Sequence, residues 1–228
     1  MVIKSITDNV VEHLRSKIIT GEIAAGQKLN VTDIIAELDI SVPPLREALR
    51  VLENDHLVVS IPRKGAYVSD ISIAELQKLL QAREMLECYS IRLLKEKNIR
   101  RLPEVESAIS IPPRLSMPDR NNPEELLDYF KMHLNFHIKL VESTDNDWMI
   151  SCYNSVSYQL SRYQFIHLYV RGKKQREKEH HEIIALIKAG SYEQAEEKLR
   201  LHIRNTYKNL KAKILQNETK KGQANRET

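Results

Sequence analysis

The chain of 228 residues has little of what interrupts helices. It contains 6 Gly and 8 Pro, only 6% of its residues are aromatic, and 29% are charged. Low glycine and proline with high charge are typical of a helix-rich soluble protein. A chain of this length can bury a sizeable core, in one large or two small domains. The composition therefore predicts a mainly α-helical protein.

Membrane, secretion and disulfide signals are also missing. No apolar run approaches the ~18 residues of a membrane span, and the N-terminus has neither a continuous apolar core nor a small-residue cleavage site. We therefore expect no membrane association and a cytoplasmic location. Cys88 and Cys152 lie far apart, inside helical patterns and without C-x-x-C spacing. They predict two buried, reduced thiols.

The net charge of +4 is weak evidence for a nucleic-acid partner, because the excess is not where it would be needed. Residues 1–70 contain 8 Lys/Arg and 10 Asp/Glu, whereas the segment from Lys208 onward contains 6 basic and 2 acidic residues. Any DNA-binding role must therefore depend on where individual charges point.

Residues 1–70 have the pattern of three helices followed by a β-hairpin. Helical periodicity ends at Gly21, a short helix follows over Ile34–Leu38, and Pro43-Pro44 opens a further helix that ends near Asn54. Two β-rich runs then flank Pro-Arg-Lys-Gly: Leu57–Ile61 and Ala66–Ser69. This order predicts a winged helix-turn-helix, which places a helix end and a basic hairpin tip against DNA.

Several side chains of this unit are suited to DNA contacts. A serine at the turn can cap the next helix and reach a phosphate, and an arginine in the first turns can read a guanine edge. A lysine and a glycine at the hairpin tip suit the minor groove. The alternative is an ordinary solvated helix, with Arg46, Glu47 and Arg50 as surface charge. The predicted DNA-binding residues are Ser41, Pro44, Arg46, Arg50, Lys64 and Gly65.

The stretch LREALRVLENDHLVVSIPRKGAYV, residues 45–68, resembles the winged-helix signature of the GntR family of bacterial transcription regulators. The resemblance implies that Arg46 reads a base and that Lys64–Gly65 forms the tip of the wing. Val42 stands where the family usually has arginine, Pro43 where it has threonine, and His56 where it has glycine. These departures predict an operator reader with fewer specific contacts than its relatives.

The remainder of the chain predicts an all-α antiparallel bundle over residues 71–216. Ser72-x-x-Glu75 is a capping box ahead of a long helix, and further helical patterns continue to about Leu215 around a proline-rich loop at 101–122. The polar segment 217–228 is predicted to be a disordered tail.

Histidines of the second region suggest a metal site. His133 and His137 share one helix face, and antiparallel packing would bring His180 and His202 toward them. Imidazole suits late first-row ions, so zinc or nickel is expected. The alternative is that buried histidines are satisfied by hydrogen bonds alone.

The second region also resembles the FCD ligand-binding domain of the FadR-type branch of the family. The resemblance rests on Phe136-His137, Asn146, Glu179-His180 and His202. It implies metal ligation by His137, His180 and His202, with His133 in the place of the family's aspartate.

Arg83 lies on the apolar side of the first helix of this region, one turn before Glu87. A charged group on a buried stripe needs a partner. Spacing alone allows a simple Arg83–Glu87 pair, whereas the resemblance implies that Arg83 anchors a ligand carboxylate. Arg83 and Glu87 are thus the predicted effector-binding residues.

These expectations combine into a homodimeric transcription regulator, a repressor rather than an activator, that binds operator DNA, a divalent metal ion and a small organic acid. One alternative is the same regulator with a metal-free pocket for an organic ligand. A more distant alternative is a metal-dependent hydrolase with Glu87, Glu179 or Glu182 as its base. The sequence disfavours the hydrolase. His181-Glu182 resembles the start of an H-E-x-x-H motif, but Ala185 stands where the motif needs its second histidine.

Overall fold

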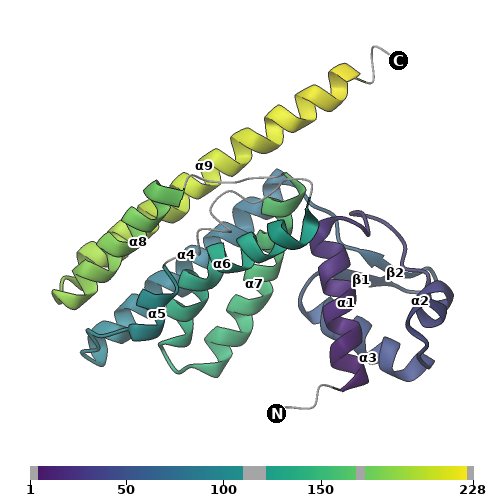
Figure 1. The fold of residues 1–228 in the computed structure, drawn as a ribbon, viewed down its shortest axis with the longest axis horizontal. Coiled ribbons are helices and arrows are strands. Elements are labelled where there is room, and N and C mark those ends of the chain that lie inside the picture. Colours follow the sequence, from purple (N-terminus) through teal and green to yellow (C-terminus); the bar gives the residue numbers. More distant parts are fainter. Residues whose placement is uncertain (1–4, 110–121, 168–172, 225–228) are drawn as a thin grey trace. The chain divides into compact units, whose positions relative to one another are not determined.

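The computed structural model describes residues 5–109, 122–167 and 173–224, and these form two compact units, Met1–Ser72 and Ile73–Thr228 (Figure 1). The described residues are mainly helical, with a single two-stranded antiparallel hairpin in the first unit. The predicted fold class, a winged helix-turn-helix followed by a helical domain, is confirmed. No described helix is both long and apolar enough to cross a membrane.

The first unit contains three helices: α1 (Ile6–Thr20), α2 (Val31–Leu38) and α3 (Val42–Asn54). Helix α1 begins at a capping box between Ser5 and Asp8 and ends at Gly21, which adopts the left-handed conformation with φ 77°. Helix α1 packs against α3 through apolar side chains that recur at helical spacing. The buried residues of these two helices are Val10, Val11, Leu14, Ile18, Ile19, Leu45, Ala48 and Leu52.

The hairpin follows α3 and consists of β1 (Val58–Ile61) and β2 (Gly65–Val68). Val58 pairs with Val68 and Ile61 with Gly65, and an isolated antiparallel bridge joins Tyr67 to Lys28 in the loop between α1 and α2. Gly65 has φ 107°, and a Cβ atom built there would lie 3.3 Å from Cε of Lys28. The hairpin tip therefore requires glycine for its backbone conformation and for the space beside Lys28.

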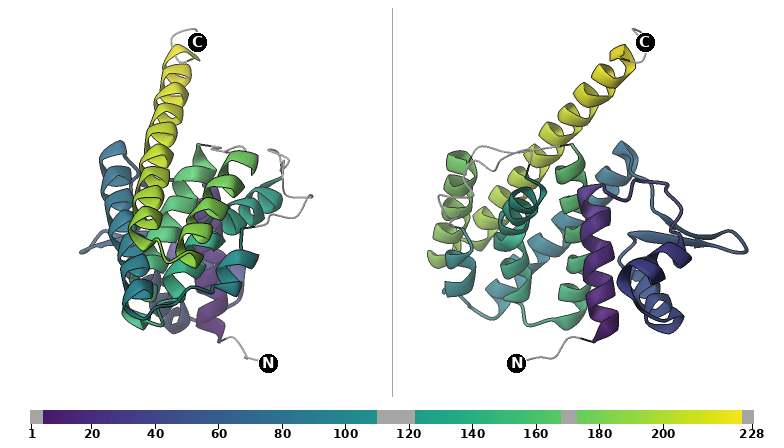
Figure 2. Two further views of the ribbon diagram at one scale, coloured as in Figure 1. Left: turned by 90° about the vertical axis from the view of Figure 1, so that its left-hand side faces the viewer. Right: turned by 45° about the vertical axis from the view of Figure 1, so that its right-hand side comes forward.

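The second unit consists of six helices among its described residues: α4 (Ile73–Glu96), α5 (Pro103–Ser107), α6 (Pro123–Glu142), α7 (Asp147–Ile166), α8 (Lys173–Lys188) and α9 (Tyr192–Ala224). Helix α4 packs against α6, α7 and α9, while α6–α7 and α8–α9 each form a helical hairpin (Figure 2). Buried histidines of α6, α8 and α9 meet in the interior of this unit: His137, His180 and His202.

The prediction of a disordered tail from residue 217 is wrong for residues 217–224, because α9 continues to Ala224. In both figures the C-terminal part of α9 extends beyond the end of α8. A polar composition does not prevent a helix, since the backbone hydrogen bonds are internal and Lys, Gln, Glu and Ala have favourable helix propensities. Residues 225–228 lie outside the described part of the chain.

The two cysteines differ in their surroundings. Cys88 is buried in α4, but Cys152 is exposed in α7, so the prediction of two buried thiols is wrong for Cys152. Position 152 is one helical turn after Trp148, whose side chain is 85% exposed, and thus lies on the outer face of α7.

Candidate metal centre and DNA-binding surface

Three histidines from three helices converge inside the second unit. His137 of α6, His180 of α8 and His202 of α9 are all buried, and one nitrogen of each lies within 4.8 Å of the others. The Nε2 atoms of His180 and His202 are 3.4 Å apart. Two nitrogens of a tetrahedral zinc site, each about 2.0–2.1 Å from the ion, are separated by a similar distance, about 3.4 Å. The donors therefore fit a late first-row divalent ion.

Two carboxylates fix the orientation of two of these rings, those of His137 and His202. The Nδ1 atom of His137 lies 2.7 Å from Oε2 of Glu87, and Nδ1 of His202 lies 2.6 Å from Oε2 of Glu179. An ionised carboxylate only accepts hydrogen bonds, so it favours the tautomer that keeps the proton on Nδ1 and leaves Nε2 able to bind a metal. The ring of His180 is stacked on Phe136, with centroids 3.9 Å apart.

Two further histidines, His133 and His181, lie near His137 and His180 in the sequence. His133 belongs to α6, four residues before His137, but its side chain lies outside the described part of the structure. Its role as a fourth ligand therefore stays a prediction. His181 is exposed, and its Nδ1 lies 2.8 Å from the carbonyl oxygen of Glu177, so it points away from the histidine cluster as expected for the neighbour of His180.

Arg83 and Glu87 form a buried ion pair in α4, which is the contact that their spacing in the sequence allowed. Nε of Arg83 donates to Oε1 of Glu87 at 2.6 Å, and both side chains are at most 1% exposed. The hydroxyl of Tyr153 in α7 donates to the same Oε1 at 2.5 Å. Among the described residues, Nη2 of Arg83 is buried without a hydrogen-bond partner. The pair thus leaves one guanidinium nitrogen for another anion.

Charge states in this cluster follow from burial and from Glu87. Burial acts to lower the pKa of Arg83, but the Glu87 carboxylate and the Tyr153 oxygen offset it, so that the pKa is raised overall. Burial, with the charge of Glu87, raises the pKa of Tyr153 well above its usual range. Arg83 therefore stays charged, and Tyr153 stays a neutral hydrogen-bond donor.

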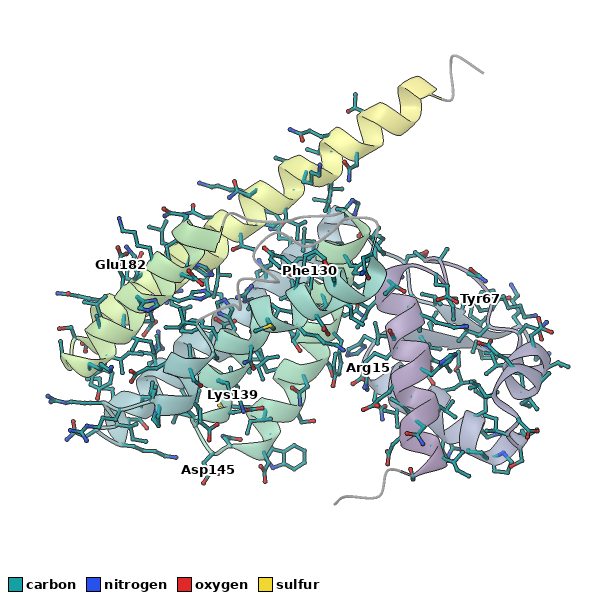
Figure 3. All side chains as sticks on the ribbon, viewed as in Figure 1. Arg15, Tyr67, Phe130, Lys139, Asp145 and Glu182 are labelled. Atoms are coloured by element: carbon teal, nitrogen blue, oxygen red, sulfur yellow. The ribbon has the colours of Figure 1, made fainter. Side chains whose placement is uncertain are left out.

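Sequence reasoning did not assign Tyr153 or the contacts of Glu87 and Glu179 with the histidine rings. The Glu87–His137 contact joins residues 50 positions apart, and no local pattern marks it. Glu182, proposed above as one base for a hydrolase, is half-exposed on α8 and forms an ion pair with Lys198 (Figure 3).

The predicted DNA-binding residues lie at the start of α3 and at the hairpin tip. Ser41, Arg46 and Arg50 are exposed, Pro44 is half-buried, and Nη1 of Arg50 donates to Oε1 of Glu47 at 2.8 Å. Lys64 and Gly65 are exposed beside Tyr67, which Figure 3 labels. These positions leave Arg46 and Lys64 open to a partner in solution.

The expected cap of α3 by the Ser41 hydroxyl is not formed. A capping hydroxyl accepts from the N–H groups of the second or third helical residue. Those positions are Pro43 and Pro44, which have no N–H group. The hydroxyl of Ser41 is therefore not used by the helix.

Comparison with known proteins gives the family. The chain matches the family model of bacterial regulatory proteins of the gntR family over residues 6–68 and that of the FCD domain over residues 78–205. It is 25% identical over 210 residues to the HTH-type transcriptional regulator BphR of Paraburkholderia xenovorans, covering 90% of this chain and 84% of BphR. It is also 25% identical over 169 residues to the gluconate operon transcriptional repressor of Bacillus subtilis, covering 74% and 67%.

Solved structures agree in fold. A GntR transcriptional regulator from a Rhodococcus species has a TM-score of 0.69 at 23% identity, with 92% of this chain and 99% of that chain covered. McbR/YncC of Escherichia coli has a TM-score of 0.66 at 15% identity, with 93% and 100% covered. With both family models matched in order along the chain, the protein belongs to the GntR family of bacterial regulatory proteins and has an FCD domain after its winged helix-turn-helix.

Proposed function

We propose that this DNA-binding transcription regulator is a repressor whose helical unit binds a divalent metal ion and a small organic acid, and that the acid modulates operator binding. The observation that carries this proposal is the buried histidine cluster next to a buried arginine with a spare nitrogen. Residues 1–70 would bind DNA, and residues 71–216 would sense the ligand, in the cytoplasm.

The metal would be held by His137, His180 and His202, with His133 as a fourth ligand. Imidazole ligands without a carboxylate favour zinc or nickel over manganese or calcium. When bound, the ion would supply positive charge that polarises and attracts a carboxylate. Because imidazole ligands are neutral, the ion would keep its full positive charge. Glu87 and Glu179 would hold the rings of His137 and His202 in place.

The acid would be anchored by Arg83. Glu87 already accepts from Nε, so a ligand carboxylate would accept from Nη2, which is buried without a hydrogen-bond partner among the described residues. The Arg83–Glu87 pair is nearly neutral as a unit. The metal ion would therefore provide most of the charge attraction for the anion, and Arg83 would add a hydrogen bond from Nη2.

The operator would be palindromic and bound by a homodimer, because helix-turn-helix dimers read two half-sites. Exposed apolar side chains of the helical unit support self-association: on α4 Met85 is 65% exposed and Tyr89 47%, and on α7 Trp148 is 85% exposed. Met85 and Tyr89 also line a groove of about 790 Å³ between α4, α7 and α9. An effector can change the operator binding of such a dimer only if it binds the arrangement that fits DNA and the arrangement that does not with different affinity. Two relatives carry the name of gluconate operon repressors.

A metal-free pocket is the second candidate. His137 and His202 each have a carboxylate partner at their Nδ1 atoms, so these rings are partly satisfied without an ion. The gntR model describes bacterial regulatory proteins, and we propose no enzymatic activity.

The role of Arg83 is tested by thermal shift and operator binding with a panel of small mono- and dicarboxylic acids, with and without added Zn²⁺ or Ni²⁺. Arg83→Lys keeps the charge but removes Nη2, and should abolish the response to the acid that the wild type recognises. Arg92→Lys, an exposed change in the same helix, should respond as the wild type does. An undiminished response of Arg83→Lys would contradict the anchor, and a response independent of metal would favour the second candidate.

A further inference from the structure

The tip of the recognition helix is apolar. Helix α3 begins with Val42, Pro43 and Pro44, and the side chain of Val42 is 46% exposed whereas that of Leu45 is 1% exposed. Single exposed valines are common on protein surfaces and need no explanation by themselves. The position of Val42 is different, because the first residues of a recognition helix are those that face base edges in a DNA complex.

The same helix end is poorly equipped to bind phosphate. A helix N-terminus holds an anion through its unpaired N–H groups, but Pro43 and Pro44 remove two of the first three in α3. Ser41 adds no cap. The loss of these donors shifts the chemistry at this end from polar contacts toward the apolar side chain of Val42.

Val42 lies on the same ridge as the two exposed arginines of α3. Successive helical residues are about 100° apart, so Arg46 is displaced from Val42 by about 40° and Arg50 by about 80°. Val51, which is 39% exposed, is displaced by about 180° and lies on the other side of the helix. An arginine that reads a base would therefore bring Val42 into the major groove, and Val51 would stay out of it.

We propose that Val42 reads the C5-methyl group of a thymine in each operator half-site. Thymine presents this methyl group in the major groove, where it makes apolar contacts that no other base offers. Val42 and Arg46 are separated by about 6 Å along the helix, so the thymine lies within about two base pairs of the base that Arg46 contacts. This inference rests on the DNA-binding role of the winged helix, and gives Val42 a contact in place of the family's arginine.

The test removes the methyl group without changing base pairing. An operator is first selected from a random duplex pool with the full-length wild-type protein. Each thymine of the selected duplex is then replaced by deoxyuridine, one symmetric pair at a time, and Kd is measured by fluorescence anisotropy at fixed salt. At one of these positions, the replacement of thymine by deoxyuridine is expected to raise the Kd of the wild type by about four-fold for each methyl group lost.

The variants assign that loss to a side chain. In Val42→Ala the penalty at that position should fall below two-fold, and Val42→Arg should also lose it, whereas Val51→Ala should keep the wild-type penalty. No uracil penalty in the wild type, or an unchanged penalty in Val42→Ala, would overturn the proposal. A wild type that selects no sequence would contradict sequence-specific DNA binding itself, whereas a selected operator without methyl dependence would contradict only the role of Val42.

Discussion

Oε2 of Glu87 lies 2.7 Å from Nδ1 of His137, while the other oxygen of the same carboxylate accepts from Nε of Arg83 and from Tyr153. One buried side chain thus contacts both a candidate metal ligand, His137, and the candidate effector anchor, Arg83. The position and charge of Glu87 affect both sites, so we expect metal binding and acid binding to depend on each other.

Glu87→Gln is expected to weaken metal binding while the overall shape of the site is kept. The amide nitrogen would have to face His137 and donate to Nδ1, which moves the ring proton to Nε2 and blocks coordination. Loss of such an orienting partner lowers metal affinity by about 10- to 100-fold. Loss of a buried ion-pair partner also destabilises a protein by about 3–5 kcal/mol. Competition with a chromophoric chelator and chemical denaturation measure the two effects.

The matched control for this variant is Glu84→Gln in the same helix. Glu84 pairs with Arg200 and Arg204 near the surface and does not contact the histidines. It should leave metal affinity unchanged. Equal losses of metal affinity in the two variants would show that Glu87 does not orient His137.

Arg46→Ala is expected to weaken operator binding without a change in thermal stability. Arg46 is exposed on α3, so its removal disturbs no core packing. A bidentate contact to a guanine contributes about 1–3 kcal/mol of discrimination, or roughly 5- to 150-fold in affinity. Gel-shift titration against a selected operator measures the loss, with Lys78→Ala as a surface control in the helical unit. An Arg46→Ala protein that binds its operator as tightly as Lys78→Ala does would remove Arg46 from the reading surface.

The two thiols are expected to react at very different rates. Burial raises the pKa of Cys88 from 9.0 to about 12, whereas Cys152 is exposed. At pH 8 a thiol reagent should modify one cysteine per native chain quickly, and the second only after unfolding. Fast modification of both in the native protein would contradict the burial of Cys88. Cys152→Ser identifies the rapidly modified residue.

The raised pKa of Cys88 also has a consequence for stability. The folded protein holds the thiol proton more tightly than the unfolded chain does, so the free energy of unfolding falls as this proton is lost at high pH. The contribution is fully present below pH 9, the ordinary pKa, and is lost as the pH rises toward 12. Cys88→Ala should therefore unfold with a weaker dependence on pH in that range, as measured by denaturation at a series of alkaline pH values.

The local elements of the fold could be predicted because periodicity, caps and breakers act over a few residues. The three helices and the hairpin of the first unit agree with the predicted bounds within a few residues, and Gly21 ends α1 as expected. The end of α9 could not be predicted from polarity, which excludes burial but does not exclude a helix. The exposure of Cys152 depends on which face of α7 packs inward, and this is a tertiary property.

The residue types of the candidate site could be predicted from the sequence, but the hydrogen bonds between its side chains could not. The convergence of His137, His180 and His202 followed from the family resemblance and from antiparallel packing. The carboxylate contacts join residues on different helices, such as Glu87 with Tyr153, 66 positions later. No spacing rule reaches that far. The prediction of a cap at Ser41 was wrong, although local chemistry already excludes it, because Pro43 and Pro44 have no N–H group to donate.

Metal content of the purified protein tests the central claim most directly. The wild type is stripped with a chelator, reloaded with Zn²⁺ or Ni²⁺, passed through a desalting column and analysed by inductively coupled plasma mass spectrometry. The proposed site predicts one retained ion per chain in the wild type and in His181→Ala, and none in the double variant His137→Ala with His180→Ala. A wild type that retains no ion, or a double variant that retains one, would contradict a metal site at these histidines.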